Sequence, residues 1–157
     1  PLQDSGVVVM DLSRYFTLQE MTASQTAARK RIDNKPGPEI LENLKDTCVQ
    51  ADRVRELLGF PMLISSGYRS LKLNIAVGGS KTSSHMQGYA MDFRCPGFGT
   101  SREVFDFLKK AMRENGIKFD QLILEYPDSP SAWVHLGFGP EMRGEILIYN
   151  GKNYLVG

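Results

Sequence analysis

The chain has 157 residues, with 19 Lys and Arg against 18 Asp and Glu, and a formal net charge of +1. Hydrophobic residues make up 41% and charged residues 24%, an ordinary globular composition that can close one hydrophobic core. The near-neutral charge argues against a nucleic-acid-binding protein, because such proteins carry a clustered basic surplus. No apolar run reaches the roughly 18 residues of a membrane helix. We therefore expect one monomeric domain with neither a nucleic acid nor a membrane as its partner.

The start of the chain carries no recognisable targeting signal. Its one apolar run is too short for a signal peptide and lacks a basic segment before it, so we expect synthesis in the cytoplasm. Residues 1–9 are expected to be an appended or disordered segment before a domain that spans 10–157. The two cysteines, Cys48 and Cys95, form no C-x-x-C pair. They are expected to be buried apolar residues, so we exclude a disulfide scaffold and a thiol-rich zinc site.

Helix signals dominate the amino-terminal half. Thr17 and Glu20 form a capping-box pattern, which indicates a short helix. The mixed polar stretch that follows gives no clear signal. A long core helix is predicted from Pro38, a residue suited to the first helical position, to Gly59, with apolar residues at helical spacing between them. Further elements are predicted as a strand at 61–66 and a helix at 70–77.

Strand signals dominate the carboxyl-terminal half. One predicted strand, in YAMDFRC, carries Asp92, and a second capping box at Thr100 and Glu103 opens an amphipathic helix. An antiparallel hairpin is predicted from FDQLILEY and AWVHLGF, joined by the turn-prone PDSPS. Asn150 and Gly151 predict a last hairpin. Helices gathered early and strands gathered late predict an α+β fold, with helices packed on one side of an antiparallel sheet.

The chain has only two histidines, and each lies near a feature that suits a metal site. His85 precedes Asp92 by seven residues, with Gly88 between them to turn the chain, so a loop histidine and a strand aspartate can converge. His135 lies on the predicted strand AWVHLGF, where a histidine taken alone is more often structural. Two imidazoles and one carboxylate form a sound ligand set for catalytic zinc, which keeps a fourth position for water. We therefore expect one zinc ion per chain, at the sheet.

A zinc hydrolase also needs a general base, and Glu125 is the candidate. In the predicted hairpin Glu125 can lie across from His135, and it shares a strand face with Ile123 and Gln121. The alternative interpretation is a solvated carboxylate at a strand end. Other standard sites are absent: the sequence has no P-loop, dinucleotide fingerprint, G-x-S-x-G or H-E-x-x-H motif.

The sequence resembles a family of zinc peptidases. The pattern S-x-H-x-x-G-x-A-x-D over residues 83–92, followed by W-V-H at 133–135, resembles the M15 group. That group includes D-Ala-D-Ala carboxypeptidases and phage L-alanyl-D-glutamate endolysins, which cut the stem peptides of peptidoglycan. The resemblance extends to SGYRS at 66–70 and covers nearly all of 12–138, and the amino-terminal half resembles a subgroup found in phage and prophage genomes.

The resemblance implies roles for individual residues. It places zinc on the two histidines and Asp92, and it places Arg69 at the site to hold carbonyl or carboxylate oxygens of the substrate. Ser83 and Trp133 are expected to bind substrate as well. Many family members carry the catalytic Asp or Glu three residues before the last histidine, where this chain has Ala132.

The base must then come from elsewhere in the chain. The L-I-L-E strand resembles the arrangement in the subgroup with W-V-H, so Glu125 takes the role, and Asp128 in the adjoining loop is the alternative. The resulting hypothesis is a zinc peptidase of D,D-carboxypeptidase or L,D-endopeptidase type that acts on the cell wall after phage-type release or another export route. One rival is an inactive zinc-containing binding or virion structural module. A second, metal-free rival requires both histidines and Asp92 to be incidental.

Overall fold

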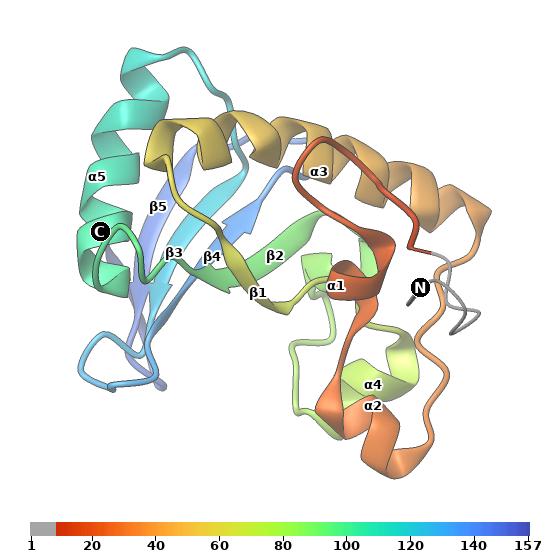
Figure 1. Cartoon of the computed structure of the whole chain (residues 1–157). Coiled ribbons are helices and arrows are strands. Elements are labelled where there is room, and N and C mark those ends of the chain that lie inside the picture. Colours follow the sequence, from red (N-terminus) through yellow and green to blue (C-terminus); the bar gives the residue numbers. More distant parts are fainter. Residues whose placement is uncertain (1–8) are drawn as a thin grey trace.

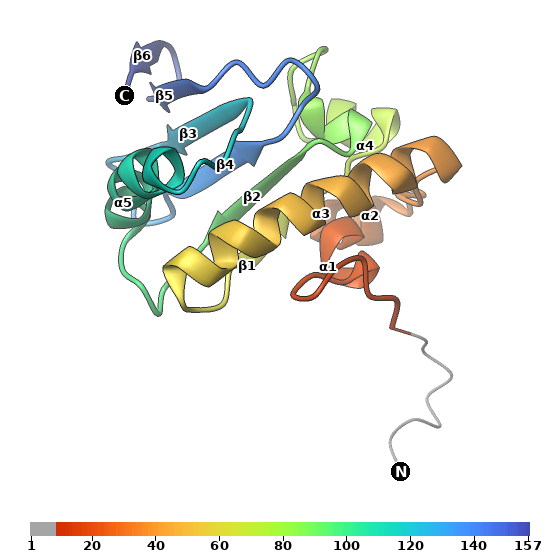
Figure 2. The same cartoon turned by 90° about the horizontal axis from the view of Figure 1, so that it is seen from above.

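A computed structural model describes residues 9–157, and Figures 1 and 2 show a mixed sheet flanked by helices. The appended or disordered segment predicted at residues 1–9 lies outside this range except for its last residue. The helices are α1 (Leu18–Thr22), α2 (Gln25–Lys30), α3 (Pro38–Leu58), α4 (Leu71–Ala76) and α5 (Ser101–Glu114), with a short 3-10 helix η2 (Ser84–Gln87). The strands are β1 (Leu63–Ser66), β2 (Ala90–Arg94), β3 (Gln121–Glu125), β4 (Trp133–Gly137), β5 (Glu145–Tyr149) and β6 (Tyr154–Val156).

The strands form one sheet in the order β1-β2-β4-β3-β5-β6. Every neighbouring pair is antiparallel except β3 and β5, which are parallel. The predicted α+β fold is confirmed, and the parallel pair is a departure from the expected antiparallel sheet. β4 already has β2 and β3 as neighbours, and β5 joins the sheet at the free edge of β3. The loop 138–144 reverses the chain after β4, and a strand antiparallel to β4 then runs parallel to β3.

One face of the sheet carries the hydrophobic core. Because side chains alternate along a strand, every second residue of β2, β3 and β4 points to this face. Helices α3 and α5 supply the opposing apolar residues, and both helices lie on the same side of the sheet in Figure 2. The fully buried strand residues of this layer are Met91, Phe93, Leu122, Leu124, Val134 and Leu136. The other face of the sheet is therefore left for the functional site.

Most of the predicted elements are confirmed. Both capping boxes form, with Thr17 and Thr100 as N-caps, and α3 ends at Gly59 with a positive φ of 74°. Helix α2 was not predicted, because it is short and its only start signal is the N-cap Ser24, whose side chain accepts a hydrogen bond from Ala27. Figure 1 shows α1, α2 and α4 together on the side of the sheet where β1 and β2 lie. Within residues 9–157 we find no helix with the length and apolarity that crossing a bilayer requires.

An ion pair fixes the crossover that carries the chain to β5. The Arg143 guanidinium donates to both carboxylate oxygens of Asp120, at 2.9 and 2.8 Å, and the backbone N–H of Arg143 donates to the same group at 3.0 Å. These hydrogen bonds hold the pKa of Asp120 below its ordinary value, although partial burial opposes the shift. A bidentate pair of this kind fixes direction as well as distance. It therefore helps to place β5 and β6 at the edge of the sheet next to β3.

Candidate metal centre

The register of β2, β4 and β3 brings two of the predicted ligands together. Asp92 on β2 pairs with His135 on β4, and His135 pairs with Ile123 on β3. Because residues that pair directly point to the same face, Asp92 and His135 lie side by side on the face away from the core. Their immediate neighbours along the strands are core residues, which ties the candidate ligands to a rigid part of the fold.

His85 reaches the same point from outside the sheet. It lies in η2, where the Ser83 hydroxyl caps the turn by accepting a hydrogen bond from the backbone N–H of His85 at 3.3 Å. Gly88 ends the turn at a positive φ of 77°, and a Cβ there would lie 2.9 Å from the carbonyl oxygen of Ile40. Only glycine fits both demands without strain. The predicted turn at Gly88, which lets a loop histidine approach a strand aspartate, is therefore confirmed.

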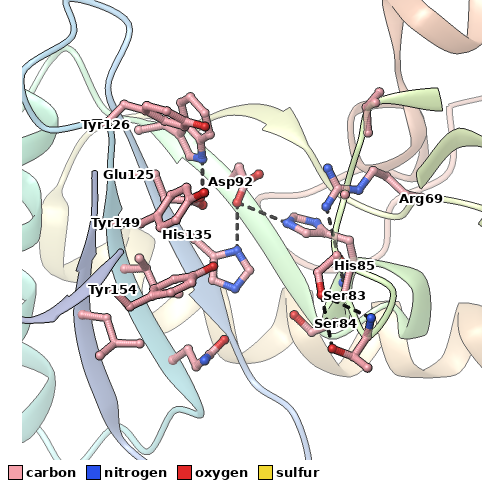
Figure 3. Close-up of a pocket in the computed structure, with 18 of the residues that line it drawn as sticks. Arg69, Ser83, Ser84, His85, Asp92, Glu125, Tyr126, His135, Tyr149 and Tyr154 are labelled. Carbon is pink, nitrogen blue, oxygen red and sulfur yellow. Dashed lines mark hydrogen bonds and ion pairs between the residues drawn. The ribbon is translucent and has the colours of Figure 1, made fainter. Parts of the chain in front are cut away.

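The three side chains form a compact, buried cluster. His85 Nε2 lies 3.2 Å and His135 Nδ1 lies 3.0 Å from the same oxygen of Asp92, Oδ1. One potential ligand atom from each residue lies within 4.8 Å of the others. The exposed fractions are 2% for His85 and 7% for both Asp92 and His135. Figure 3 shows the two imidazoles approaching the carboxylate from different sides.

The hydrogen bonds of His85 favour a cation at this cluster. Its Nδ1 lies 2.7 Å from the carbonyl oxygen of Gly67, and a carbonyl only accepts, so Nδ1 must carry the hydrogen. The neutral imidazole then presents a lone pair at Nε2 to an oxygen of Asp92, which is also an acceptor. Two facing acceptors need a proton or a metal ion between them. Backbone carbonyls orient metal-binding histidines in the same way, so the residues fit a zinc site.

The pKa shifts of Asp92 and His135 are consistent with a zinc site at this cluster. Burial opposes ionisation of Asp92, but its close contacts with the two imidazoles, that of His85 first, hold the pKa of Asp92 well below its ordinary range. Burial likewise opposes a charged His135, and the hydrogen bond and charge of Asp92 reverse the effect and raise the pKa of His135. Asp92 is thus ionised, as a carboxylate ligand must be. His135 Nε2 is buried and has no hydrogen-bond partner among residues 9–157.

Glu125 lies on the same face of the sheet, two residues beyond Ile123 along β3. The expectation that Glu125 lies across from His135 is wrong, because Glu125 pairs with Trp133 and the residue across from His135 is Ile123. The turn 126–132 sets this register. Since side chains alternate, Glu125 still shares the face of His135. The indole N–H of Trp133 donates to Oε2 of Glu125 at 3.0 Å, which orients the carboxylate.

The surroundings of Glu125 suit a proton acceptor. Burial, followed by the nearby charge of Asp92, raises the pKa of Glu125 above its ordinary value, against the opposing effects of His135, Trp133 and Arg69. A raised pKa strengthens a carboxylate as a base near neutral pH. The alternative base, Asp128, is exposed in the β3–β4 turn and is not among the residues that line the cavity. At Ala132 the backbone carbonyl accepts a hydrogen bond from the Ser101 hydroxyl at 2.7 Å.

Arg69 forms the wall opposite Glu125. Its Nη2 donates to the Ser83 hydroxyl at 3.1 Å, and its backbone N–H donates to the carbonyl of His85 at 3.2 Å. Burial lowers the pKa of the guanidinium, and its Nε is buried without a hydrogen-bond partner among residues 9–157. Figure 3 shows the guanidinium across the cavity from Glu125, with the candidate ligands between them. Arg69 therefore keeps hydrogen-bonding capacity for an oxygen ligand.

These residues surround one cavity of about 810 Å³ on the open face of the sheet. Its lining includes all six side chains to which the sequence analysis gave a metal-binding or substrate-binding role, together with Glu125. It also includes three tyrosines that the sequence analysis missed: Tyr126, Tyr149 and Tyr154. The signal for two of them was available, because the predicted last hairpin places Tyr149 and Tyr154 beside its turn. What the sequence lacked was the position of that hairpin next to β3.

The arrangement is typical of one class of protein, the mononuclear metal-dependent hydrolases. Three buried ligands, a nearby carboxylate and an open cavity provide the parts that such chemistry requires. Comparison with family models gives a more specific result. The peptidase M15 model matches residues 14–135, and the chain belongs to this family. A sequence comparison with curated proteins gives no significant match. The chain is therefore a metallopeptidase of the M15 family, and membership supports a peptidoglycan-type substrate in general.

Proposed function

We propose that this protein is a zinc peptidase that hydrolyses amide bonds in the stem peptide of bacterial peptidoglycan. His85, Asp92 and His135 are the proposed ligands of one zinc ion. The observation that carries the proposal is the pair of facing acceptors, Nε2 of His85 and Oδ1 of Asp92, at 3.2 Å in a buried cluster. The family match supports the peptidase activity.

Zinc at this cluster supplies Lewis acidity toward the carbonyl oxygen of the scissile amide. The protein's own groups manage the protons. Glu125 accepts a proton from the attacking water, whose oxygen bonds to the acyl carbon, and returns a proton to the amine nitrogen as the C–N bond breaks. Trp133 holds the carboxylate in place through its indole N–H. Arg69 faces the substrate from the opposite wall and stabilises carbonyl or carboxylate oxygens, with Ser83 as its hydrogen-bond partner.

Digestion of purified cell wall tests the proposal directly. Zinc-loaded protein should release new amino and carboxyl ends from the stem peptide, and a chelator should abolish the release. Mass spectrometry of the products identifies the bond. Release of D-alanine indicates a D,D-carboxypeptidase, and cleavage between L-alanine and D-glutamate indicates an endopeptidase suited to phage-type lysis. If the fully zinc-loaded protein releases no product from wall or stem peptides, the proposed activity is wrong.

One observation favours a second candidate function. Ala132 stands where many family members carry the catalytic acid, so the chain fits an inactive zinc-containing module that binds cell wall or forms part of a virion. Such a module would bind zinc and cleave no peptide. The same digestion separates the two candidates, because only the enzyme changes the masses of the stem peptides.

Arg69→Lys should lower kcat/KM on stem peptides by about 10- to 100-fold, the value of one or two charge-assisted hydrogen bonds. A lysine keeps the charge but lacks the planar fork that Arg69 presents. Zinc content and Tm should stay near wild type, because Arg69 contacts no candidate ligand through its side chain. Arg113→Lys, on the exposed end of α5, is the matched control. Equal kcat/KM for Arg69→Lys and wild type would remove Arg69 from the site.

A further inference from the structure

The tyrosines of the cavity form part of an ordered row across the sheet. Trp133 on β4 pairs with Glu125 on β3, Glu125 pairs with Tyr149 on β5, and Tyr149 pairs with Tyr154 on β6. All four residues therefore share one face, and the row runs parallel to the row that contains His135, two residues away along β4. Two members of the row, Tyr149 and Tyr154, follow the segment matched by the family model, which ends at residue 135. The last hairpin thus adds its own wall to the cavity.

The aromatic rings of this wall pack against one another. Ring centroids are 5.1 Å apart for Trp133 and Tyr126, 5.6 Å for Tyr126 and Tyr149, and 4.6 Å for Tyr149 and Tyr154. Tyr126 joins the row from the turn after β3 at a positive φ of 53°, where its backbone N–H donates to the carbonyl of Tyr149 at 2.8 Å. A non-glycine residue adopts this conformation rarely, so the surroundings of Tyr126 must hold it there.

The hydroxyl groups of the wall are free to bind a ligand. Figure 3 shows the hydroxyl ends of Tyr126, Tyr149 and Tyr154 pointing the same way, toward the candidate ligands and the Arg69 wall. Within the described part of the chain, none of the three hydroxyls has a hydrogen-bond partner. Each hydroxyl can both donate and accept. Tyr126 and Tyr154 remain 39% and 59% exposed, so the wall offers ring surface as well as hydroxyl groups.

We infer that Tyr126, Tyr149 and Tyr154 bind main-chain amide groups of the peptide substrate, on the side of the scissile bond away from Arg69. This inference rests on the proposed peptidase function. An extended peptide offers an N–H donor and a carbonyl acceptor at each residue, and a tyrosine hydroxyl can pair with either of them. The wall therefore selects for substrates that extend beyond the residue at the zinc.

Phenylalanine variants test the inference because they remove only the hydroxyl. Tyr149→Phe, Tyr154→Phe and the double variant are compared with wild type on zinc-loaded protein. The substrates are sugar-free stem peptides lengthened one residue at a time, and sugar-bearing muropeptides with the same stems. Each single variant should lower kcat/KM on the longest peptide by about 2- to 10-fold, mainly through a higher KM. The loss should shrink as the peptide is shortened. Tyr15→Phe is the matched control, since Tyr15 packs on Arg55 at 4.6 Å and lies outside the cavity lining.

Each other outcome overturns the inference in a recognisable way. If the double variant matches wild type on every peptide, or loses the same factor at every length, the wall binds no extended main chain, and the peptidase function stands. If the loss appears only with sugar-bearing muropeptides, the wall binds glycan instead. If wild type itself cleaves no peptide, the proposed function and the inference fail together. Zinc content and Tm, measured on every sample, show that each variant is folded and loaded.

Discussion

Glu125→Gln is expected to lower kcat on stem peptides by about 10² to 10⁴, the usual contribution of a general acid–base group. Glutamine keeps the size of the side chain and can still accept the hydrogen bond from Trp133, which is 3.0 Å in the wild type. It cannot accept the proton of the attacking water. Zinc content and Tm should therefore stay near wild type, since Glu125 is outside the candidate ligand cluster.

The pH dependence of the wild-type enzyme gives a second readout of the same role. A general base works in its ionised form, so kcat/KM should rise with pH through the pKa of Glu125. Burial raises that pKa above the ordinary glutamate value, and the acid limb of the profile should be displaced to higher pH accordingly. Asp128→Asn is the matched control, because Asp128 is the alternative base and is exposed outside the cavity. A large loss with Asp128→Asn and a change of only a few-fold with Glu125→Gln would exchange the two roles.

Local signals in the sequence were sufficient for most of the helices and strands. A capping box depends on two side chains three residues apart, so Thr17 with Glu20 and Thr100 with Glu103 could be recognised from the sequence and are found in the structure. The convergence of His85 and Asp92 was also a local matter, because they are only seven positions apart with one turn at Gly88 between them. His135 was harder to place, since its contact with Asp92 depends on the pairing of β2 with β4.

Features that depend on long-range pairing could not be predicted. The residue that pairs with Glu125 depends on the register of the β3–β4 hairpin. A two-residue turn fixes the register of a hairpin, but a connection of seven residues, as here, does not. The parallel contact of β5 with β3 and the tyrosine wall that follows from it depend on the crossover 138–144. That crossover is held by Arg143 and Asp120, residues that are 23 positions apart. No local pattern identified them as partners.

The largest effect on metal binding is expected from the candidate ligands themselves. His85→Ala, Asp92→Ala and His135→Ala should each weaken zinc binding by more than the roughly 10- to 100-fold that changes to outer-shell partners cost. The reason is geometric: each side chain supplies one of the three ligand atoms that lie within 4.8 Å of one another, and no other cluster of this kind occurs among residues 9–157. Two ligands alone hold zinc poorly, because structural and catalytic zinc sites take three or four protein ligands.

Zinc analysis of the purified proteins, with titration against a chelator of known affinity, measures this effect without reference to activity. Thermal unfolding supplies an independent readout. Added zinc should raise the Tm of wild type, because a ligand that binds the folded state stabilises it by mass action, and it should not raise the Tm of His85→Ala. Asp106→Asn, on the exposed face of α5, is the matched control and should bind zinc as wild type does. A His85→Ala protein that retains one zinc per chain with wild-type affinity would contradict the metal site. It would also leave the facing acceptors of His85 and Asp92 to be explained by a shared proton.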